Sequence, residues 1–169
     1  MIAPAHTTTV TRARLVLVAI ALGLAALDLG LKAWAERGLT DGRYVDLGVI
    51  QLRLAFNPGV AFSLGDTLPA WLVLTLTGLI ITGLAVYTWR TARTGTRPTR
   101  LALGVVLAGA VANFVDRARD GVVTDYLHTG WFPTFNGADV YITLGAITLI
   151  LATLHAERRA THRTERGAP

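Results

Sequence analysis

The chain contains no cysteine and only one serine, Ser63, among its 169 residues. The absence of cysteine excludes disulfide bonds, thiolate metal ligands and a cysteine nucleophile. The single serine leaves serine-hydrolase chemistry with one candidate nucleophile. Charged residues are also scarce, at 16% against 52% hydrophobic residues. This balance is too apolar for an ordinary soluble domain and indicates a membrane protein.

The four histidines do not indicate a metal site. His6, His155 and His162 fall in the terminal segments, which leaves His128 alone elsewhere in the chain. Metal centres need several ligands brought together, and no such group is visible in the sequence. We therefore expect neither a metal ion nor another cofactor.

The apolar residues are gathered into four runs. Residues 15–35 are interrupted only by Asp28 and Lys32, and residues 68–89 carry no charge at all. Both runs are long enough to cross the hydrocarbon core at about 1.5 Å per residue. Two shorter runs, at about 101–116 and 139–154, are expected to cross as well by including a polar turn at one end. The prediction is an all-α membrane protein with four transmembrane helices in a single domain.

The basic residues predict the orientation of these spans. If residues 1–14 and 155–169 are cytoplasmic tails, 10 of the 16 basic residues lie in short segments on the cytoplasmic side. This positive-inside bias places both termini in the cytoplasm. The net charge of +5 then reflects topology and contact with membrane phospholipid, and no nucleic acid partner is expected because no basic stripe is interleaved with aromatic residues. The cytoplasmic arginines are Arg12, Arg14, Arg90, Arg93, Arg97, Arg100, Arg158, Arg159, Arg163 and Arg166.

Local patterns define the remaining segments. Residues 1–14 are expected to be a disordered threonine-rich tail, and the first span is expected to be retained rather than cleaved as a signal peptide. Residues 50–56 carry large apolar side chains at every second position, which predicts a half-buried strand in the first outer loop. Residues 90–100, with Gly95 and Pro98, predict a short cytoplasmic connection.

Asp28 and Lys32 are ionisable residues inside the first span, where an unpaired charge is costly. They are four residues apart, so they share one helix face and can neutralise each other. We favour a structural ion pair. The alternative, in which Lys32 is the general base for Ser63, lacks a visible oxyanion-hole partner.

Asp125 and Asp139 are the better candidates for chemistry. Asp125 stands alone in an apolar segment, and Asp139 directly precedes the last span, on the same side of the membrane. Taken singly, Asp125 could be a turn residue or a partner of Arg117 or Arg119, and Asp139 a helix N-cap. Taken together, two close carboxylates can share a proton, activate water and polarise a peptide carbonyl, which is aspartic-protease chemistry.

Spacing cannot show that the two aspartates converge, but five blocks of the sequence add evidence. The blocks are Asp28-x-x-x-Lys32, Asn57-Pro58-Gly59-Val60-Ala61-Phe62-Ser63-Leu64, Gly109-Ala110-Val111-Ala112-Asn113-Phe114-Val115-Asp116-Arg117, Gly121-Val122-Val123-Thr124-Asp125-Tyr126 and Phe135-Asn136-Gly137-Ala138-Asp139. In this order they resemble the motifs of the lipoprotein signal peptidase (signal peptidase II) family. The resemblance extends from about Asp28 to Gly145 on a four-span chain.

The resemblance implies an aspartyl endopeptidase of the bacterial cytoplasmic membrane, expected to be a monomer, with its active site toward the outer face. It would remove signal peptides from prolipoproteins by cleaving before a diacylglyceryl-modified cysteine. The implied fold adds a small extracytoplasmic β-cradle and a short outer amphipathic helix to the four spans. Asp125 and Asp139 match the catalytic residues; the matched substrate- or lipid-binding residues are Asn57, Gly59, Asn113, Arg117 and Asn136, and the supporting residues are Asp28, Lys32 and Asp116.

The sequence departs from the family pattern at five positions, none of them a catalytic group: Leu29, Leu31, Ala112, Gly137 and Val140. Two other functions fit parts of the sequence. An inactive homologue that binds lipidated peptides would not need both aspartates. An ion- or proton-translocating protein would place acids near mid-span, where only Asp28 lies, beside Lys32.

Overall fold

Four helices and three strands make up the fold in a computed structural model that describes residues 5–58 and 69–167. Statements about side chains below concern residues 10–58 and 69–159. In chain order the elements are α1 (Ala5–Gly38), β1 (Tyr44–Asp46), β2 (Gln51–Asn57), α2 (Ala70–Thr94), α3 (Arg97–Asp120), β3 (Val123–His128) and α4 (Gly137–Gly167).

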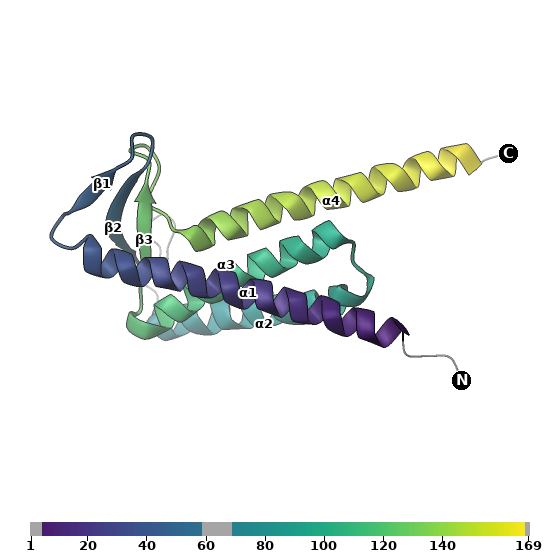
Figure 1. Ribbon diagram of the computed structural model, residues 1–169, viewed down its shortest axis with the longest axis horizontal. Coiled ribbons are helices and arrows are strands. Elements are labelled where there is room, and N and C mark those ends of the chain that lie inside the picture. The colour runs from purple at the N-terminus through teal and green to yellow at the C-terminus, as the bar shows by residue number, and fades with distance from the viewer. Residues whose placement is uncertain (1–4, 59–68, 168–169) are drawn as a thin grey trace.

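The strands gather at one end of the helices, and both chain termini lie toward the other end (Figure 1). Helix α3 packs most extensively against α4 and α1, and less against α2. Within this core the closest contacts are between small residues, with Ala25, Ala112 and Ala138 forming one buried cluster. Small side chains let membrane helices approach closely, which brings the polar residues of α1, α3 and α4 together.

The described helices confirm the prediction of four apolar helices that could cross a membrane. The segments with this property are Val10–Gly38, Ala70–Thr94, Arg97–Asp120 and Gly137–Arg159. Large apolar side chains such as Leu22, Ile80 and Leu151 point outward along the helices. In water such surfaces would be unfavourable, whereas in a bilayer they contact lipid tails.

The sheet confirms the strand predicted at residues 50–56, which is β2, and adds two strands that the sequence did not reveal. The strands are antiparallel in the order β1-β2-β3. A register irregularity lies between Leu52 and Ala55 of β2, and Ala55 pairs with Asp125 of β3. An additional bridge between Leu127 and Phe135 ties the loop after β3 to the sheet. The small sheet therefore carries one candidate catalytic aspartate.

Two features of the terminal segments differ from expectation. Helix α1 begins at Ala5, so the prediction of a disordered tail at residues 1–14 is wrong for most of that segment, and α4 continues through the charged tail to Gly167. No proline or glycine lies between Ala5 and Gly23, so nothing stops the helix from propagating beyond the membrane. The outer amphipathic helix implied by the family is not among the described elements, and residues 59–68 lie outside the described part of the chain.

The predicted cytoplasmic connection is short. Helix α2 ends at Thr94, α3 starts at Arg97, and Thr96 caps α3 by accepting a hydrogen bond from the Thr99 backbone N–H at 3.4 Å. Gly95 and Pro98 thus mark the turn between two antiparallel helices, as their positions predicted.

Replacing Gly109 by alanine should destabilise the protein. A Cβ at this position of α3 would collide with the Ala138 carbonyl oxygen and lie 2.9 Å from a side-chain carbon of Ile142 in α4. Overpacking of this kind costs about 1–3 kcal/mol in free energy of unfolding. We expect a lower melting temperature in detergent for Gly109→Ala. Gly83→Ala is the matched control, because a Cβ there meets nothing within 4 Å. An equal effect of both changes would contradict the close α3–α4 contact.

Candidate active site

Asp125 and Asp139 lie on the same cavity, although the sheet supplies one and a helix the other. Asp125 is on β3, and Asp139 is in the first turn of α4. Both line an open cavity of about 900 Å³ whose wall is mostly apolar. Asp125 is buried, with an exposed fraction of 2%. The convergence that sequence spacing could not establish is therefore present in the structure.

Asn136 bridges the two aspartates. Its side-chain amide donates to Asp125 Oδ1 at 2.7 Å. Its Oδ1 accepts from the Asp139 backbone N–H at 3.0 Å, and Asp139 Oδ2 accepts from the Asn136 backbone N–H at 3.2 Å. This reciprocal pattern is a capping box, so Asn136 is the N-cap of α4 and Asp139 occupies position N3. The alternative in which Asp139 itself is the N-cap is wrong, because the helix begins two residues earlier.

Asp125 binds its proton more tightly than a free aspartate does. Burial, followed by the negative charge of Asp139, raises the pKa of Asp125 from 3.8 to about 6. Hydrogen bonds from Asn136 and Asn57 and the positive charge of Lys32 act in the opposite direction but do not cancel the increase. A carboxyl group with a raised pKa beside a second carboxylate is the arrangement that acid–base catalysis by aspartate pairs requires.

This pKa predicts a pH-dependent stability. The folded state binds the Asp125 proton more tightly than the unfolded state, so the free energy of unfolding falls as pH rises from 3.8 through about 6. Asp125→Asn cannot ionise and should escape this loss, worth about 1–3 kcal/mol above pH 7. We expect the variant to melt several degrees above the parent at pH 8 and close to it at pH 4.

Melting curves in detergent across this pH range would measure the effect, with Asp120→Asn as the control because Asp120 is exposed at the end of α3. A constant difference between Asp125→Asn and the parent at every pH would contradict the raised pKa.

Behind the cavity, a buried polar network joins α1, α3 and α4. Lys32 Nζ lies 3.2 Å from Asp28 Oδ2 and 3.1 Å from Asp116 Oδ2, and it donates to Asn113 Oδ1 at 2.6 Å. The Asn113 amide in turn donates to Asp139 Oδ1 at 2.9 Å. The predicted ion pair between Asp28 and Lys32 is confirmed, and it extends through Asn113 to a candidate catalytic carboxylate.

The same contacts count against Lys32 as a general base. Its side chain is fully buried in ion pairs with two carboxylates and does not line the cavity. Ser63, its suggested partner, lies outside the described residues.

Tyr126 is a member of this site that the sequence reading overlooked. Its hydroxyl donates to Asp28 Oδ1 at 3.0 Å and accepts from the Gly137 backbone N–H at 3.1 Å. Burial and the charge of Asp28 raise the pKa of Tyr126, so the hydroxyl stays protonated. A Cβ on Gly137 would lie 2.8 Å from both Asp28 Oδ1 and the tyrosine oxygen. The glycine that departs from the family pattern is therefore required here by a close contact.

The remaining predicted residues either lie near Asp125, connect β3 to α3, or fall outside the described part of the chain. Asn57 lines the cavity and hydrogen-bonds Asp125, and Arg117 interacts electrostatically with Asp116, Asp125 and Asp139. Asp116 accepts from the Thr124 backbone N–H at 2.7 Å and so ties β3 to α3. Gly59 lies outside the described residues.

Arg119, which was considered as a partner of Asp125, instead lies 3.8 Å from Glu36 Oε2. Glu36 also accepts a hydrogen bond from the Thr124 hydroxyl at 2.8 Å. Arg119 therefore pairs with Glu36, and the groups that interact with Asp125 include Asn57, Asn136 and Arg117. Glu36 was not singled out in the sequence, where it follows the first span as an ordinary charged residue.

The sequence analysis also did not single out Trp131, Phe132 and Phe135, which form an aromatic wall of the cavity. Trp131 and Phe132 pack edge to face with centroids 5.6 Å apart, and Phe132 and Phe135 do the same at 6.0 Å. All three line the cavity that holds the aspartates, together with Leu144 of α4. The cluster of three aromatic residues within five positions was the available signal.

These features define an integral membrane enzyme of the aspartyl peptidase class: four apolar helices, an aspartate pair and a largely apolar cavity between sheet and helices. Comparison with known proteins agrees. The family described as signal peptidase (SPase) II matches residues 20–155. The chain belongs to that family and has a signal peptidase II role in lipoprotein processing, as a multi-pass bacterial membrane protein that acts on lipoprotein precursors.

Individual relatives are similar over most of their length. The chain is 39% identical to a lipoprotein signal peptidase of Rhodococcus jostii, covering 83% of this chain and 73% of the relative. It is 37% identical to one of Dehalococcoides mccartyi, covering 85% and 91%. A bacterial membrane enzyme solved by the in meso method at 2.3 Å resolution superposes with a TM-score of 0.70 at 25% identity, covering 83% of this chain and 88% of the other. The sequence resemblance to this family is thereby confirmed.

Proposed function

We propose that this protein cleaves diacylglyceryl-modified prolipoproteins immediately before the lipidated cysteine, using a water molecule activated by Asp125 and Asp139. The observation that carries the proposal is that these two carboxylates, from different elements, line one cavity and are bridged by Asn136. No covalent intermediate is required, because water is the nucleophile.

In the proposed reaction each carboxyl group accepts one proton and donates one proton. Asp139, ionised, takes a proton from water while the resulting hydroxide attacks the scissile carbonyl carbon. Asp125, protonated, donates to the carbonyl oxygen, which gives a tetrahedral diol. In the second step that proton returns to Asp125, and Asp139 delivers its proton to the leaving amide nitrogen as the C–N bond breaks. Both carboxyl groups regain their starting states.

Asn113 and Asn136 hold the two carboxylates in position. Their amide donors point at the two carboxylates, so we assign them to positioning the pair rather than to the contacts with substrate that the family resemblance suggested. Asn57, which lies on the open cavity, and Arg117 are the better candidates for contacts with peptide carbonyls or polar lipid atoms. The role of Gly59 remains that implied by the family.

The aromatic wall fits a lipidated substrate. Trp131, Phe132 and Phe135 supply apolar surface beside the aspartates, where acyl chains would be shielded from water. We propose that the sheet end faces the outer side, with both termini in the cytoplasm, because the arginines of the opposite end follow the positive-inside bias. We also propose that the enzyme acts as a monomer.

The test is cleavage by the full-length protein, purified in a neutral detergent. The substrate is a diacylglyceryl-modified prolipoprotein, and the control is the same polypeptide with an unmodified cysteine. We expect one cut before the modified cysteine and little cutting of the control. Binding of the modified substrate without cleavage would replace this proposal by an inactive homologue that binds lipidated peptides. Equal cleavage of both substrates would contradict the role of the apolar cavity.

A further inference from the structure

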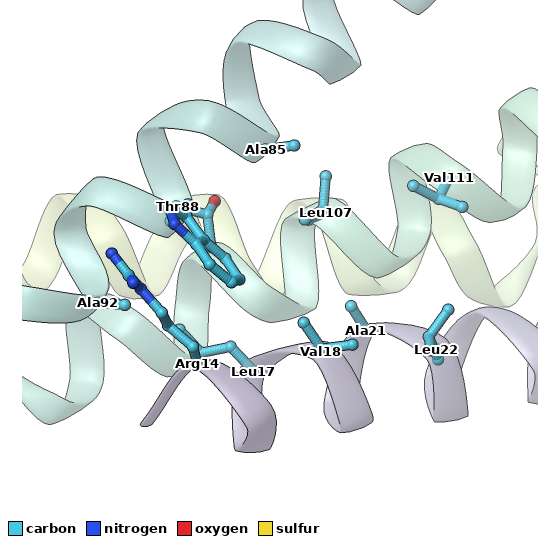
Figure 2. A pocket seen from close by; sticks show the side chains of 11 residues that line it. Arg14, Leu17, Val18, Ala21, Leu22, Ala85, Thr88, Ala92, Leu107 and Val111 are labelled. Carbon is cyan, nitrogen blue, oxygen red and sulfur yellow. The ribbon is translucent and has the colours of Figure 1, made fainter. Parts of the chain in front are cut away.

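A second cavity shares no lining residue with the cavity that holds the aspartates. It has a volume of about 240 Å³, is partly open, and is lined by α1, α2 and α3. Figure 2 shows Arg14 and Leu17 at one end and Leu22 and Val111 at the other, so the cavity runs lengthwise along α1. None of the residues proposed for peptidase chemistry lines it.

The interior of this cavity is apolar. Its wall consists of Leu, Val and Ala side chains, apart from Arg14, Trp89 and Thr88. The Thr88 hydroxyl donates to the Leu84 carbonyl oxygen of its own helix at 2.7 Å, so it offers no free donor to a ligand. A long hydrocarbon chain suits such a surface, whereas a polar solute does not.

One end of the cavity, by contrast, carries the positive charge of Arg14. The Arg14 guanidinium lies over the Trp89 ring at 4.2 Å from its centroid. Within the described residues, Arg14 Nε is buried and has no hydrogen-bond partner. A stacked guanidinium keeps its edge free for an anion, and Arg matches phosphate oxygens well.

The segments that line this cavity contain no acidic residue. Residues 1–27 and 67–115, which supply every residue of the cavity wall, contain six arginines and no aspartate or glutamate. Basic residues near a membrane surface attract anionic headgroups.

The depth of Arg14 and Trp89 matches the headgroup level. Arg14 directly precedes Leu15, the first residue of the apolar run in α1. Trp89 lies five residues before the end of α2. Tryptophan is enriched at this level of the bilayer, and arginine near a helix end extends toward it.

We propose that this cavity binds one anionic phospholipid, with an acyl chain lying between α1, α2 and α3 and the phosphate held by Arg14. The lipid comes from the leaflet at the N-terminal end of α1, which is the cytoplasmic leaflet in the proposed topology. The site is separate from the cavity proposed for substrate. This proposal requires that the protein is inserted in a membrane, but it does not require that the protein is an active peptidase.

The test is a lipid titration of the delipidated full-length protein in neutral detergent, followed by native mass spectrometry. Dioleoylphosphatidylglycerol should give a first bound lipid at concentrations where dioleoylphosphatidylcholine gives little. Arg14→Gln should weaken that first binding event about tenfold, as expected for losing one charge-assisted hydrogen bond. Arg12→Gln is the matched control, because it removes the same charge from an exposed position two residues away and should change binding less than twofold.

A second variant tests the acyl-chain part of the site. Ala21→Phe adds bulk to the cavity wall without changing charge, and it should also weaken binding of phosphatidylglycerol. Asp125→Asn should bind the lipid like the parent, so failure of cleavage and failure of lipid binding can be told apart. Equal losses in Arg12→Gln and Arg14→Gln, unchanged binding in folded Ala21→Phe, or equal binding of the two lipids would each overturn the proposal.

Discussion

Replacing either Asp125 or Asp139 by asparagine is expected to lower the rate of prolipoprotein cleavage by about 10²–10⁴-fold, the usual contribution of a positioned acid or base. Asparagine keeps the shape of aspartate but can neither take a proton from water nor give one to the substrate. The single-turnover cleavage rate of purified variants measures the effect. Asp120→Asn, an exposed acid at the end of α3, should retain the parent rate.

The two variants should differ in stability, which separates chemistry from folding. Asp125→Asn removes a carboxyl group whose ionisation is unfavourable in its buried surroundings. Asp139→Asn replaces an acceptor that receives bonds from the Asn113 amide and the Asn136 backbone N–H, so one donor loses its partner. We expect the second variant to lose about 1–2 kcal/mol of stability. If either folded variant cleaved at the parent rate, the proposed mechanism would be wrong.

Replacing Lys32 by methionine is expected to produce the largest loss of stability. Lys32 is the cation between Asp28 and Asp116, and all three side chains are almost completely buried. Removing one partner of a buried ion pair leaves an uncompensated charge and costs about 3–5 kcal/mol. We expect Lys32→Met to melt well below the parent in detergent or to fail to accumulate as a folded protein. Arg37→Met, at an exposed position of the same helix, should be close to the parent.

A double variant tests the physical cause. Adding Asp116→Asn to Lys32→Met removes one of the two stranded carboxylates, while an asparagine oxygen can still accept from the Thr124 backbone N–H. The double variant should therefore be more stable than Lys32→Met alone. A further loss of stability would show that Lys32 contributes mainly through its packing rather than its charge.

The largest surprises in the fold lie where the sequence carries a weak signal. The strand at residues 50–56 alternates clearly, and β2 is there. Strand β3 is mostly buried, so its residues do not alternate, and β1 is only three residues long. Short or fully buried strands form because a neighbouring strand pairs with them, which no local pattern records. The helical extensions beyond the spans were missed because charge was read as a boundary, whereas charged residues continue a helix readily.

In the candidate site too, the sequence indicated some residues, and only the tertiary contacts revealed others. The resemblance selected Asp125, Asp139 and the asparagines because their residue types and order follow a family pattern. It assigned Asn136 to substrate, which stays a prediction; only the structure reveals that this residue also caps α4 and bridges the two aspartates. Tyr126 escaped notice because a tyrosine in an apolar strand reads as core, and only its contact with Asp28, nearly a hundred residues earlier, reveals its role.

The sequence by itself determined that this chain has four apolar helices, how its charges are distributed between the two ends and which residue types are available for chemistry. These properties follow from hydrophobicity and composition, which act locally. The tertiary structure decided which polar residues meet: Asp125 with Asp139, Lys32 with both Asp28 and Asp116, and Arg14 with Trp89. Such meetings depend on how helices and strands pack, because close contacts between small residues such as Gly109 and Ala138 set the distances between elements.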